Sequence, residues 1–302
     1  MNCPVALFAY RRIQHLRLVV KSLQENTLAS ETDLFIFCDG AKSPDDVDAV
    51  TEVRSFCRRV SGFRSVTVIE RDHNLGLSAS IVDGVSQLCN EYGFVAVVED
   101  DVIVSRHFLS WVNAALKKYE HDTRVFSVGC YVFPTDRKLE NSFFLSLPDC
   151  WGWAVWGRSW KFYQADGASL LRELKARNLQ RKFDFDGAFP YTDMLKKQIE
   201  GKNDSWAIRW SASVLLAGGL TVYPGKSMTQ NIGFDGTGTH CGENDIYDQS
   251  LSETCPDLQD IPVVESDEAR EAWRDFLLKL KRENIRDKVL SRVVRKIKRL
   301  LK

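Results

Sequence analysis

The sequence predicts an α/β fold, with a Rossmann-like and mainly parallel sheet flanked by helices. Over the first hundred residues, short apolar runs rich in β-branched and aromatic residues alternate with stretches whose apolar residues recur at helical spacing. The runs are almost continuously hydrophobic, which is typical of parallel strands buried on both faces. With 302 residues and 44% hydrophobic content, the chain can bury such a core without disulfide or metal staples.

The first hundred residues contain four predicted strands with three helices between them. The strands are residues 4–9, 33–38, 65–70 and 94–98, and the helices are residues 13–23, 47–60 and 77–88. Ser43-Pro44 precedes the second helix, and a serine followed by proline is a common way for a helix to begin. This order predicts a β-α-β-α unit.

The alternation stops after residue 101. We expect a helix near 105–119 and a strand near 125–128, followed by segments rich in aromatic residues and glycine. From residue 263 onward there is no glycine or proline, and apolar residues recur every three or four positions from Ile285 to Leu300 on a basic background, as in an amphipathic helix. The predicted divisions of the chain are 1–101, 102–262 and 263–302.

Charge is balanced overall but uneven along the chain. The 41 basic and 41 acidic residues give no bulk attraction to nucleic acid, and the basic C-terminal stretch lacks the interleaved aromatics of a nucleic-acid binder. Residues 279–302 carry eleven Lys or Arg and two Asp or Glu, a net charge of +9. This stretch is interpreted as a helix that lies on an anionic membrane surface, or as one that packs on its own domain through Val289, Val293 and Ile297; the two are compatible.

The sequence gives no sign of export. No window reaches the length of an apolar membrane span, and the first residues lack the charged region of a signal peptide. The eight cysteines form no Cys-x-x-Cys pair. We therefore expect a cytoplasmic protein with buried, reduced thiols. Peripheral attachment to the inner face of the membrane would be through the basic tail.

Polar residues directly follow each of the four predicted strands. They are Tyr10-Arg11-Arg12, Asp39-Gly40, Arg71-Asp72-His73-Asn74 and Glu99-Asp100-Asp101. Each alone could be a cap or a turn. Because ligands of parallel sheets bind beyond the carboxyl ends of the strands, four such segments at one edge predict a binding site.

The acidic triplet Glu99-Asp100-Asp101 is the strongest local signal. Three adjacent like charges at a sheet edge are costly unless a cation neutralises them, and Mg²⁺ or Mn²⁺ binds one or two carboxylates together with substrate phosphates. The alternative is that Asp101 caps a helix from residue 105, although a cap needs only one carboxylate. Asp184-Phe185-Asp186 and Asp45-Asp46 follow no buried strand and are interpreted as a loop feature and a first-turn helix charge.

Taken in order, these motifs resemble nucleotide-sugar-dependent glycosyltransferases of the GT-A fold. The triplet is similar to the Glu-Asp-Asp version of the Asp-x-Asp motif in inverting N-acetylglucosaminyltransferases. The series Asn74-Leu75-Gly76, Trp151-Gly152-Trp153 and Asn203-Asp204-Ser205-Trp206 resembles bacterial family-two-type members. The resemblance covers about residues 3–240 and leaves the tail outside it.

The resemblance implies a metal-dependent, inverting transferase. The donor would be a nucleoside-diphosphate sugar, with a UDP-sugar favoured, and a hexosyl or N-acetylhexosaminyl group would pass to a hydroxyl of a glycan or lipid-linked glycan. Residues 1–101 would bind the donor, and 102–262 would bind the acceptor and catalyse transfer. Bacterial surface polysaccharide synthesis on the inner face of the membrane would suit a basic tail.

The resemblance also implies roles for individual residues. On the donor side, Asp39 would contact the base, Arg11 the diphosphate, Arg71, Asn74 and Gly76 the donor, and Glu99 and Asp100 the sugar and ribose hydroxyls. Asp101 would be the direct metal ligand, His240 in the loop 233–240 a second contact to metal or diphosphate, and Asp204 the catalytic base. His240 could instead lie in a surface turn, and Asp204 could be an ordinary N-cap.

Trp151 and Trp153 are candidate acceptor-binding residues. On a strand their side chains would share one face, where flat rings can stack on sugars. The alternative is that tryptophans fill a core, which is the interpretation favoured for Trp156, Trp160 and Trp210.

Two other functions compete with transfer. One is a non-catalytic carbohydrate-binding protein that retains the fold, in which the acids bind metal without turnover. The other is a sugar nucleotidyltransferase, which would need a glycine-rich phosphate loop after the first strand. The segment Tyr10-Arg11-Arg12-Ile13-Gln14 contains no glycine, so this option is disfavoured.

Overall fold

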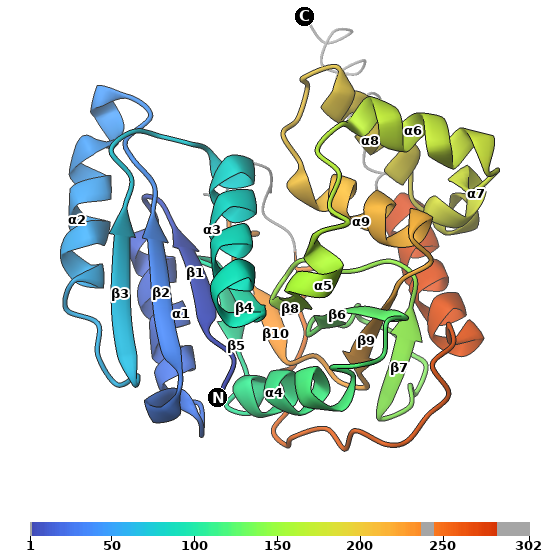
Figure 1. Cartoon of the computed structure of the whole chain (residues 1–302), viewed down its shortest axis with the longest axis horizontal. Helices are drawn as coiled ribbons and strands as arrows, with labels where there is room; N and C mark the ends of the chain where they lie inside the picture. The colour runs from blue at the N-terminus through green and yellow to red at the C-terminus, as the bar shows by residue number, and fades with distance from the viewer. Residues whose placement is uncertain (1, 237–244, 283–302) are drawn as a thin grey trace, which may run out of the picture.

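The computed structural model describes residues 2–236 and 245–282 and shows an α/β protein built on a large central sheet (Figure 1). Its eight strands lie in the order β3-β2-β1-β4-β8-β6-β9-β7. They are β1 (Val5–Ala9), β2 (Asp33–Cys38), β3 (Ser65–Glu70), β4 (Phe94–Glu99), β6 (Val125–Gly129), β7 (Ser142–Leu145), β8 (Trp153–Trp156) and β9 (Leu220–Pro224). A second, two-stranded sheet pairs β5 (Val102–Val104) with β10 (Thr229–Asn231).

Helices cover both faces of the sheet. They are α1 (Ile13–Gln24), α2 (Val47–Cys57), α3 (Leu77–Tyr92), α4 (Phe108–Lys118), α5 (Gly157–Trp160), α6 (Gly167–Ala176), α7 (Gln180–Phe183), α8 (Tyr191–Ile199) and α9 (Trp206–Leu216). Apolar residues of α1, α2 and α4 form one buried cluster against the strands, and those of α3 and α9 form another. Figure 1 shows α6, α7 and α8 gathered beside the half that contains β6, β7 and β9.

The first half of the fold confirms the predicted alternation. The four strands β1 to β4 match the four predicted runs within a residue, and α1, α2 and α3 lie where helical spacing indicated. β1, β2, β3 and β4 pair in parallel, and their register aligns Ala9 with Cys38, Cys38 with Glu70, and Phe8 with Glu99. The carboxyl ends of all four strands therefore meet at one edge.

The second half of the sheet is mixed. β8 is antiparallel to both β4 and β6, whereas β9 is parallel to β6, and β7 is antiparallel to β9. The predicted helix near 105–119 begins only at Phe108, because β5 pairs with β10 immediately after the acidic triplet. Asp101 therefore caps no helix, and that alternative is wrong.

The beginning of the predicted C-terminal helix belongs to the core. Residues 267–282 are helical, and this helix inserts Trp273, Phe276 and Leu277 into a third cluster with residues of β7, α8 and α9. Residues 283–302, which carry most of the predicted basic face, lie outside the described residues. Within the described part of the chain, no helix is both long enough and apolar enough to span a membrane.

The cysteines of the described residues are unpaired. Five are buried, Cys150 is partly buried and Cys255 is exposed. This agrees with the expectation of thiols that lie mainly in the core.

Candidate active site

The candidate site is the edge where β1, β2, β3 and β4 end. Because the four strands are in register, the residues that follow them are neighbours: Tyr10 after β1, Asp39 after β2, Arg71 after β3 and Asp100 after β4. The backbone amide of Tyr10 donates to the Asp100 carboxylate at 3.3 Å, which joins the ends of β1 and β4 directly.

Arg12, at the start of α1, neutralises the acids at the end of β4. Its Nη2 donates to Asp101 Oδ2 at 2.8 Å and also to Asp100 Oδ1. Asp100 and Asp101 are 5% and 9% exposed, so these are buried ion pairs. Sequence reasoning singled out the neighbouring Arg11 instead. The sequence offers two adjacent arginines after the first predicted strand and does not specify which of them meets the acids.

Arg11 points elsewhere in the structure. Its guanidinium pairs with Asp46 at 2.5 Å, and half of its side chain is exposed. Its predicted contact with a diphosphate stays a prediction, whereas Arg12 pairs with the carboxylates of Asp100 and Asp101.

Burial makes the acidic edge costly to ionise. Burial raises the pKa of Glu99 well above its usual range, and repulsion from Asp101 and Asp100 adds to this. Burial also raises the pKa of Asp100, although the charge of Arg12 opposes the rise. A second cation at this edge would relieve the remaining repulsion.

Asp101 has one carboxylate oxygen available for such a cation. Its Oδ1 is buried and has no hydrogen-bond partner, while its backbone carbonyl accepts from the amide of Ile232 at 2.7 Å. A Cβ on Gly233 would overlap Oδ2 of Asp101, so the chain after β10 packs directly on the carboxylate. In the described residues no three His, Cys, Asp or Glu side chains form a ready metal cage.

The donor set nevertheless fits Mg²⁺ or Mn²⁺. These hard cations commonly use one or two carboxylates and complete their coordination with water and substrate phosphates. The buried, unpartnered Oδ1 of Asp101 is a ligand of this kind. The predicted second contact, His240, lies outside the described residues.

Asp39 holds the loop after β3 in place through hydrogen bonds. Its Oδ1 accepts from the amides of Gly40 and Leu75, and its Oδ2 accepts from the amide of Gly76 and from the Asn74 side chain, all within 3.0 Å. A side chain at Gly40 would overlap the backbone of His73, so glycine is needed for this approach. The carboxylate predicted to read a base is thus fully used in positioning Asn74 and Gly76.

The same loop leads into α3, which begins near the edge where β1 to β4 end. Gly76 has φ +77°, a left-handed conformation that favours glycine, and immediately precedes α3. No side chain caps this helix, so its first backbone amides have no side-chain acceptor at the N-terminus. Arg71 lies across the Phe37 ring, 5.5 Å from its centre, and pairs with Asp83 on α3.

Asp204 stands just before α9 and is not its cap. Ser205 is the N-cap, and its side chain accepts from the amide of Ile208 at 3.2 Å. The Asp204 side chain is 71% exposed and lies 3.4 Å from Nη2 of Arg209. The interpretation of Asp204 as an ordinary N-cap is therefore wrong.

Arg209 links Asp204 to the start of α3. The Arg209 side chain is 11% exposed, and its Nη2 also donates to Ser78 Oγ at 2.5 Å. Ser78 lies two residues after Gly76. The candidate base therefore stands next to the loop that Asp39 holds.

The two candidate acceptor tryptophans lie on different faces. Gly152 has φ +79°, and β8 begins only at Trp153. Trp153 is 1% exposed and its ring stacks on Trp206, 5.2 Å between centres, in the cluster of α3 and α9. Trp151 is partly exposed and packs against the other two clusters. The expectation that both rings share one face is wrong, because the glycine interrupts the extended backbone.

Trp151 instead belongs to an aromatic group beside the acidic edge. Its ring centre lies 4.7 Å from Tyr131, 5.4 Å from Phe234 and 5.3 Å from Tyr247. Of the two tryptophans, only Trp151 is partly exposed.

Sequence reasoning missed Asp149. This carboxylate accepts from the amide of Trp151 at 2.8 Å, and burial raises its pKa to about 7. Its negative charge contributes to the raised pKa of Glu99, which places it near the acidic edge. The signal available in the sequence is a lone acid two residues before Trp151.

The other acidic pairs have structural roles, as predicted. Asp184 accepts from the amide of Thr192 at 2.6 Å, and Asp186 pairs with Arg270 at 3.2 Å. Asp46 accepts from Ser43 at the start of the turn that precedes α2.

Comparison with known proteins gives structural likeness only. No protein-family model matches the chain, and no curated protein matches it. Among solved structures, S. aureus TarS 1-349 is 11% identical with a TM-score of 0.38, over 52% of this chain and 47% of that chain. The mannosyltransferase PcManGT from Pyrobaculum calidifontis, in complex with GDP-Man and Mn²⁺, is 13% identical with a TM-score of 0.37, over 72% of this chain and 74% of that chain.

The chain thus spans about half the length of the first of these structures. Similarity this low carries no information on which reaction the chain catalyses, so function has to be argued from its own residues.

Proposed function

We propose that the protein is a metal-dependent glycosyltransferase that moves a sugar from a nucleoside-diphosphate sugar to an acceptor hydroxyl. The observation that carries the proposal is the buried Asp100-Asp101 pair at the end of β4, where Asp101 keeps one oxygen without a partner. A structural salt bridge to Arg12 would need no such spare ligand atom.

The donor would lie along the common edge of β1 to β4. Asn74 and Gly76 are held there by Asp39, and the uncapped start of α3 offers amide donors to an anion. Arg12 and the bound cation would together balance the negative charge of the diphosphate. A UDP-sugar is the favoured donor.

Asp101 would hold Mn²⁺ or Mg²⁺ through Oδ1. When bound, the cation supplies a Lewis acid that offsets the charge developing on the leaving diphosphate. Arg12 would contribute by holding the carboxylates of Asp100 and Asp101 in place before the cation arrives.

Asp204 would be the general base. Its carboxylate is exposed and free of any capping role, so it can accept the proton of an acceptor hydroxyl. Attack from the face opposite the diphosphate would invert the anomeric carbon. Arg209 would set the orientation of Asp204 relative to the start of α3.

The acceptor would be a glycan or lipid-linked glycan, with Trp151 as a partly exposed ring beside the acids. Synthesis of a bacterial surface polysaccharide at the inner face of the membrane fits this chemistry.

Nucleotide release from UDP-, GDP- and dTDP-sugars, with and without Mn²⁺, tests the proposal. We expect release with one nucleotide class, stimulation of that release by Mn²⁺, and loss of the Mn²⁺-stimulated release in Asp101→Asn. Asp186→Asn is the matched control, because its carboxylate lies in a structural pair with Arg270 and should leave release unchanged. Full turnover by Asp101→Asn in a chelator would refute the metal role. A protein that binds these sugars without any release would be the non-catalytic alternative.

A further inference from the structure

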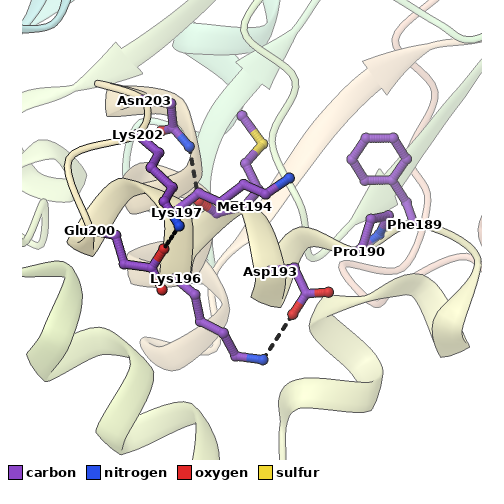
Figure 2. Close-up of a pocket in the computed structure, with 9 residues that line it drawn as sticks. All are labelled: Phe189, Pro190, Asp193, Met194, Lys196, Lys197, Glu200, Lys202 and Asn203. Atoms are coloured by element: carbon purple, nitrogen blue, oxygen red, sulfur yellow. Dashed lines mark hydrogen bonds and ion pairs between the residues drawn. The ribbon is translucent and has the colours of Figure 1, made fainter.

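A pocket of about 530 Å³ opens on the surface of α8, outside the site described so far (Figure 2). Its wall is formed by the segment before α8, the helix itself and the loop that follows it. The lining residues are Phe189, Pro190, Asp193, Met194, Lys196, Lys197, Glu200, Lys202 and Asn203.

The pocket borders the loop that carries Asp204. Asn203 lines the pocket, donates through Nδ2 to the carbonyl of Met194 at 3.2 Å, and accepts through Oδ1 from the amide of Ser205 at 3.1 Å. The first bond ties Asn203 to α8, and the second closes a short turn around Asp204. A ligand in the pocket therefore lies against the segment that holds the proposed base.

Within the described part of the chain, one lysine of the pocket makes no direct ion pair, although its charge acts on the nearby carboxylates of Asp193 and Glu200. Lys196 pairs with Asp193 at 2.8 Å, and Lys202 pairs with Glu200 at 2.6 Å. For Lys197, no ion pair is found among residues 2–236 and 245–282, and Figure 2 shows its ammonium without an interaction to the other lining residues. With three lysines, one aspartate and one glutamate, the lining of the pocket has a net charge of +1.

The chemistry of these residues favours a phosphate. A lysine ammonium is a compact point charge with rotatable donors and suits a phosphate oxygen, whereas arginine is the usual choice for the planar fork of a carboxylate. The pocket contains three lysines and no arginine. The Phe189 ring and Pro190 add an apolar wall on which the carbon face of a sugar or a lipid chain can pack.

The helix dipole alone does not account for this arrangement. Lysines near the last turn of a helix interact favourably with its C-terminus, and Lys196 and Lys197 are in that position. The dipole explains neither the cavity between α8 and Phe189 nor the two hydrogen bonds from Asn203.

We infer that this pocket is an acceptor subsite that binds a phosphate group of the acceptor through Lys197 and so presents a nearby hydroxyl to Asp204. The inference rests on the proposed function for its role in transfer, but the binding itself does not. The phosphate can belong to the glycan or to a lipid carrier, and the shared chemistry is a phosphate next to a hydroxyl-bearing or apolar group.

Binding of small probes to the full chain tests the inference. The probes are inorganic phosphate, glucose 6-phosphate, octyl phosphate and glucose, titrated at low salt with UDP present and followed by NMR. We expect the phosphate probes to bind more tightly than glucose and Lys197→Met to weaken them about fivefold, the effect of removing one partly exposed charge pair. Lys197→Arg should retain most of the binding. Lys117→Met is the matched control, because Lys117 is an exposed lysine near the end of α4.

The outcomes separate the possibilities. Tighter binding of glucose 6-phosphate than of octyl phosphate assigns the group to the glycan, and the reverse assigns it to a lipid carrier. Equal binding of glucose and the phosphate probes, or equal loss in Lys197→Met and Lys117→Met, overturns the inference. Release of nucleotide from the donor to water, measured in parallel, should be unchanged in Lys197→Met. If no donor is cleaved by the parent chain, the proposed function fails, while the titration still decides the pocket.

Discussion

Replacement of Arg12 by alanine removes the charge that Asp100 and Asp101 share. The two carboxylates are 5% and 9% exposed, so the change leaves two buried negative charges without their partner. Breaking a buried pair by removing one side costs about 3–5 kcal/mol. Since the Arg12 side chain is 22% exposed, we expect the lower end, about 3 kcal/mol. For a chain of this size that corresponds to a fall in melting temperature of about 6 °C.

Mn²⁺ should restore much of this loss. A cation that binds the folded state only, at a concentration one hundred times its dissociation constant, stabilises it by about 2.7 kcal/mol. We therefore expect Mn²⁺ to stabilise Arg12→Ala more than it stabilises the parent, because the guanidinium no longer competes for Asp101. Without a metal role for these acids, this difference between the two proteins has no cause.

Urea unfolding and thermal melting, each in chelator and in Mn²⁺, measure both effects. Arg11→Ala is the matched control, since Arg11 is half exposed and pairs with the separate residue Asp46. It should lose only a small fraction of what Arg12→Ala loses and should not gain from Mn²⁺ beyond the parent. Equal stability of Arg12→Ala and the parent in chelator, or no extra effect of Mn²⁺ on the variant, would refute this reasoning.

Three further predictions concern the same region. Asp204→Asn should lower kcat about 10²- to 10⁴-fold with little change in the KM of the donor, because the base acts on the acceptor proton; steady-state transfer measures this, and an unchanged kcat would exclude the role. Gly233→Ala should weaken Mn²⁺ binding in a direct titration, because its Cβ would overlap Oδ2 of Asp101; unaltered binding would contradict the packing. The raised pKa of Asp149, about 7, means that the folded state binds this proton more tightly than the unfolded chain. Its contribution to stability should therefore be lost as the pH rises from the usual value of 3.8 through about 7, and Asp149→Asn should flatten the decline of the free energy of unfolding in urea over that range; an equally steep decline would count against it.

The parallel half of the fold could be predicted because its signals are local. Each of β1 to β4 is a short apolar run followed by polar residues, and the helices between them keep a clear spacing. When parallel strands alternate with helices, few strand orders are possible, and the carboxyl ends of all the strands lie at one edge of the sheet. The placement of Asp39 and Asp100 at the same edge could therefore be predicted.

The mixed half could not be predicted in this way. β8 lies between β4 and β6, although it follows both in the chain, and such long-range antiparallel pairing leaves no local pattern. The positive φ of Gly152 also leaves no signal in the sequence, and it turns the side chains of Trp151 and Trp153 to different faces. The choice of Arg12 over Arg11 depends on the turn from β1 into α1, which a pair of adjacent arginines does not specify.

Asp39 shows the limit of assigning roles by position. Its place after β2 predicted a site residue, and it does lie at the site. Its carboxylate is nevertheless saturated by four donors from its own chain, so its structural role is to hold the loop at Asn74 and Gly76.

The helix at residues 267–282 has a consequence for how the chain acquires its structure during synthesis. Trp273, Phe276 and Leu277 complete the cluster built by β7, α8 and α9, and the amide of Ser266 bonds to the carbonyl of Phe144 across more than a hundred residues. The half with β1 to β4 can form while the ribosome is still at work, whereas the other half keeps an open apolar surface until this helix emerges. A nascent chain stalled before residue 267 should consequently attract chaperones or aggregate through that surface.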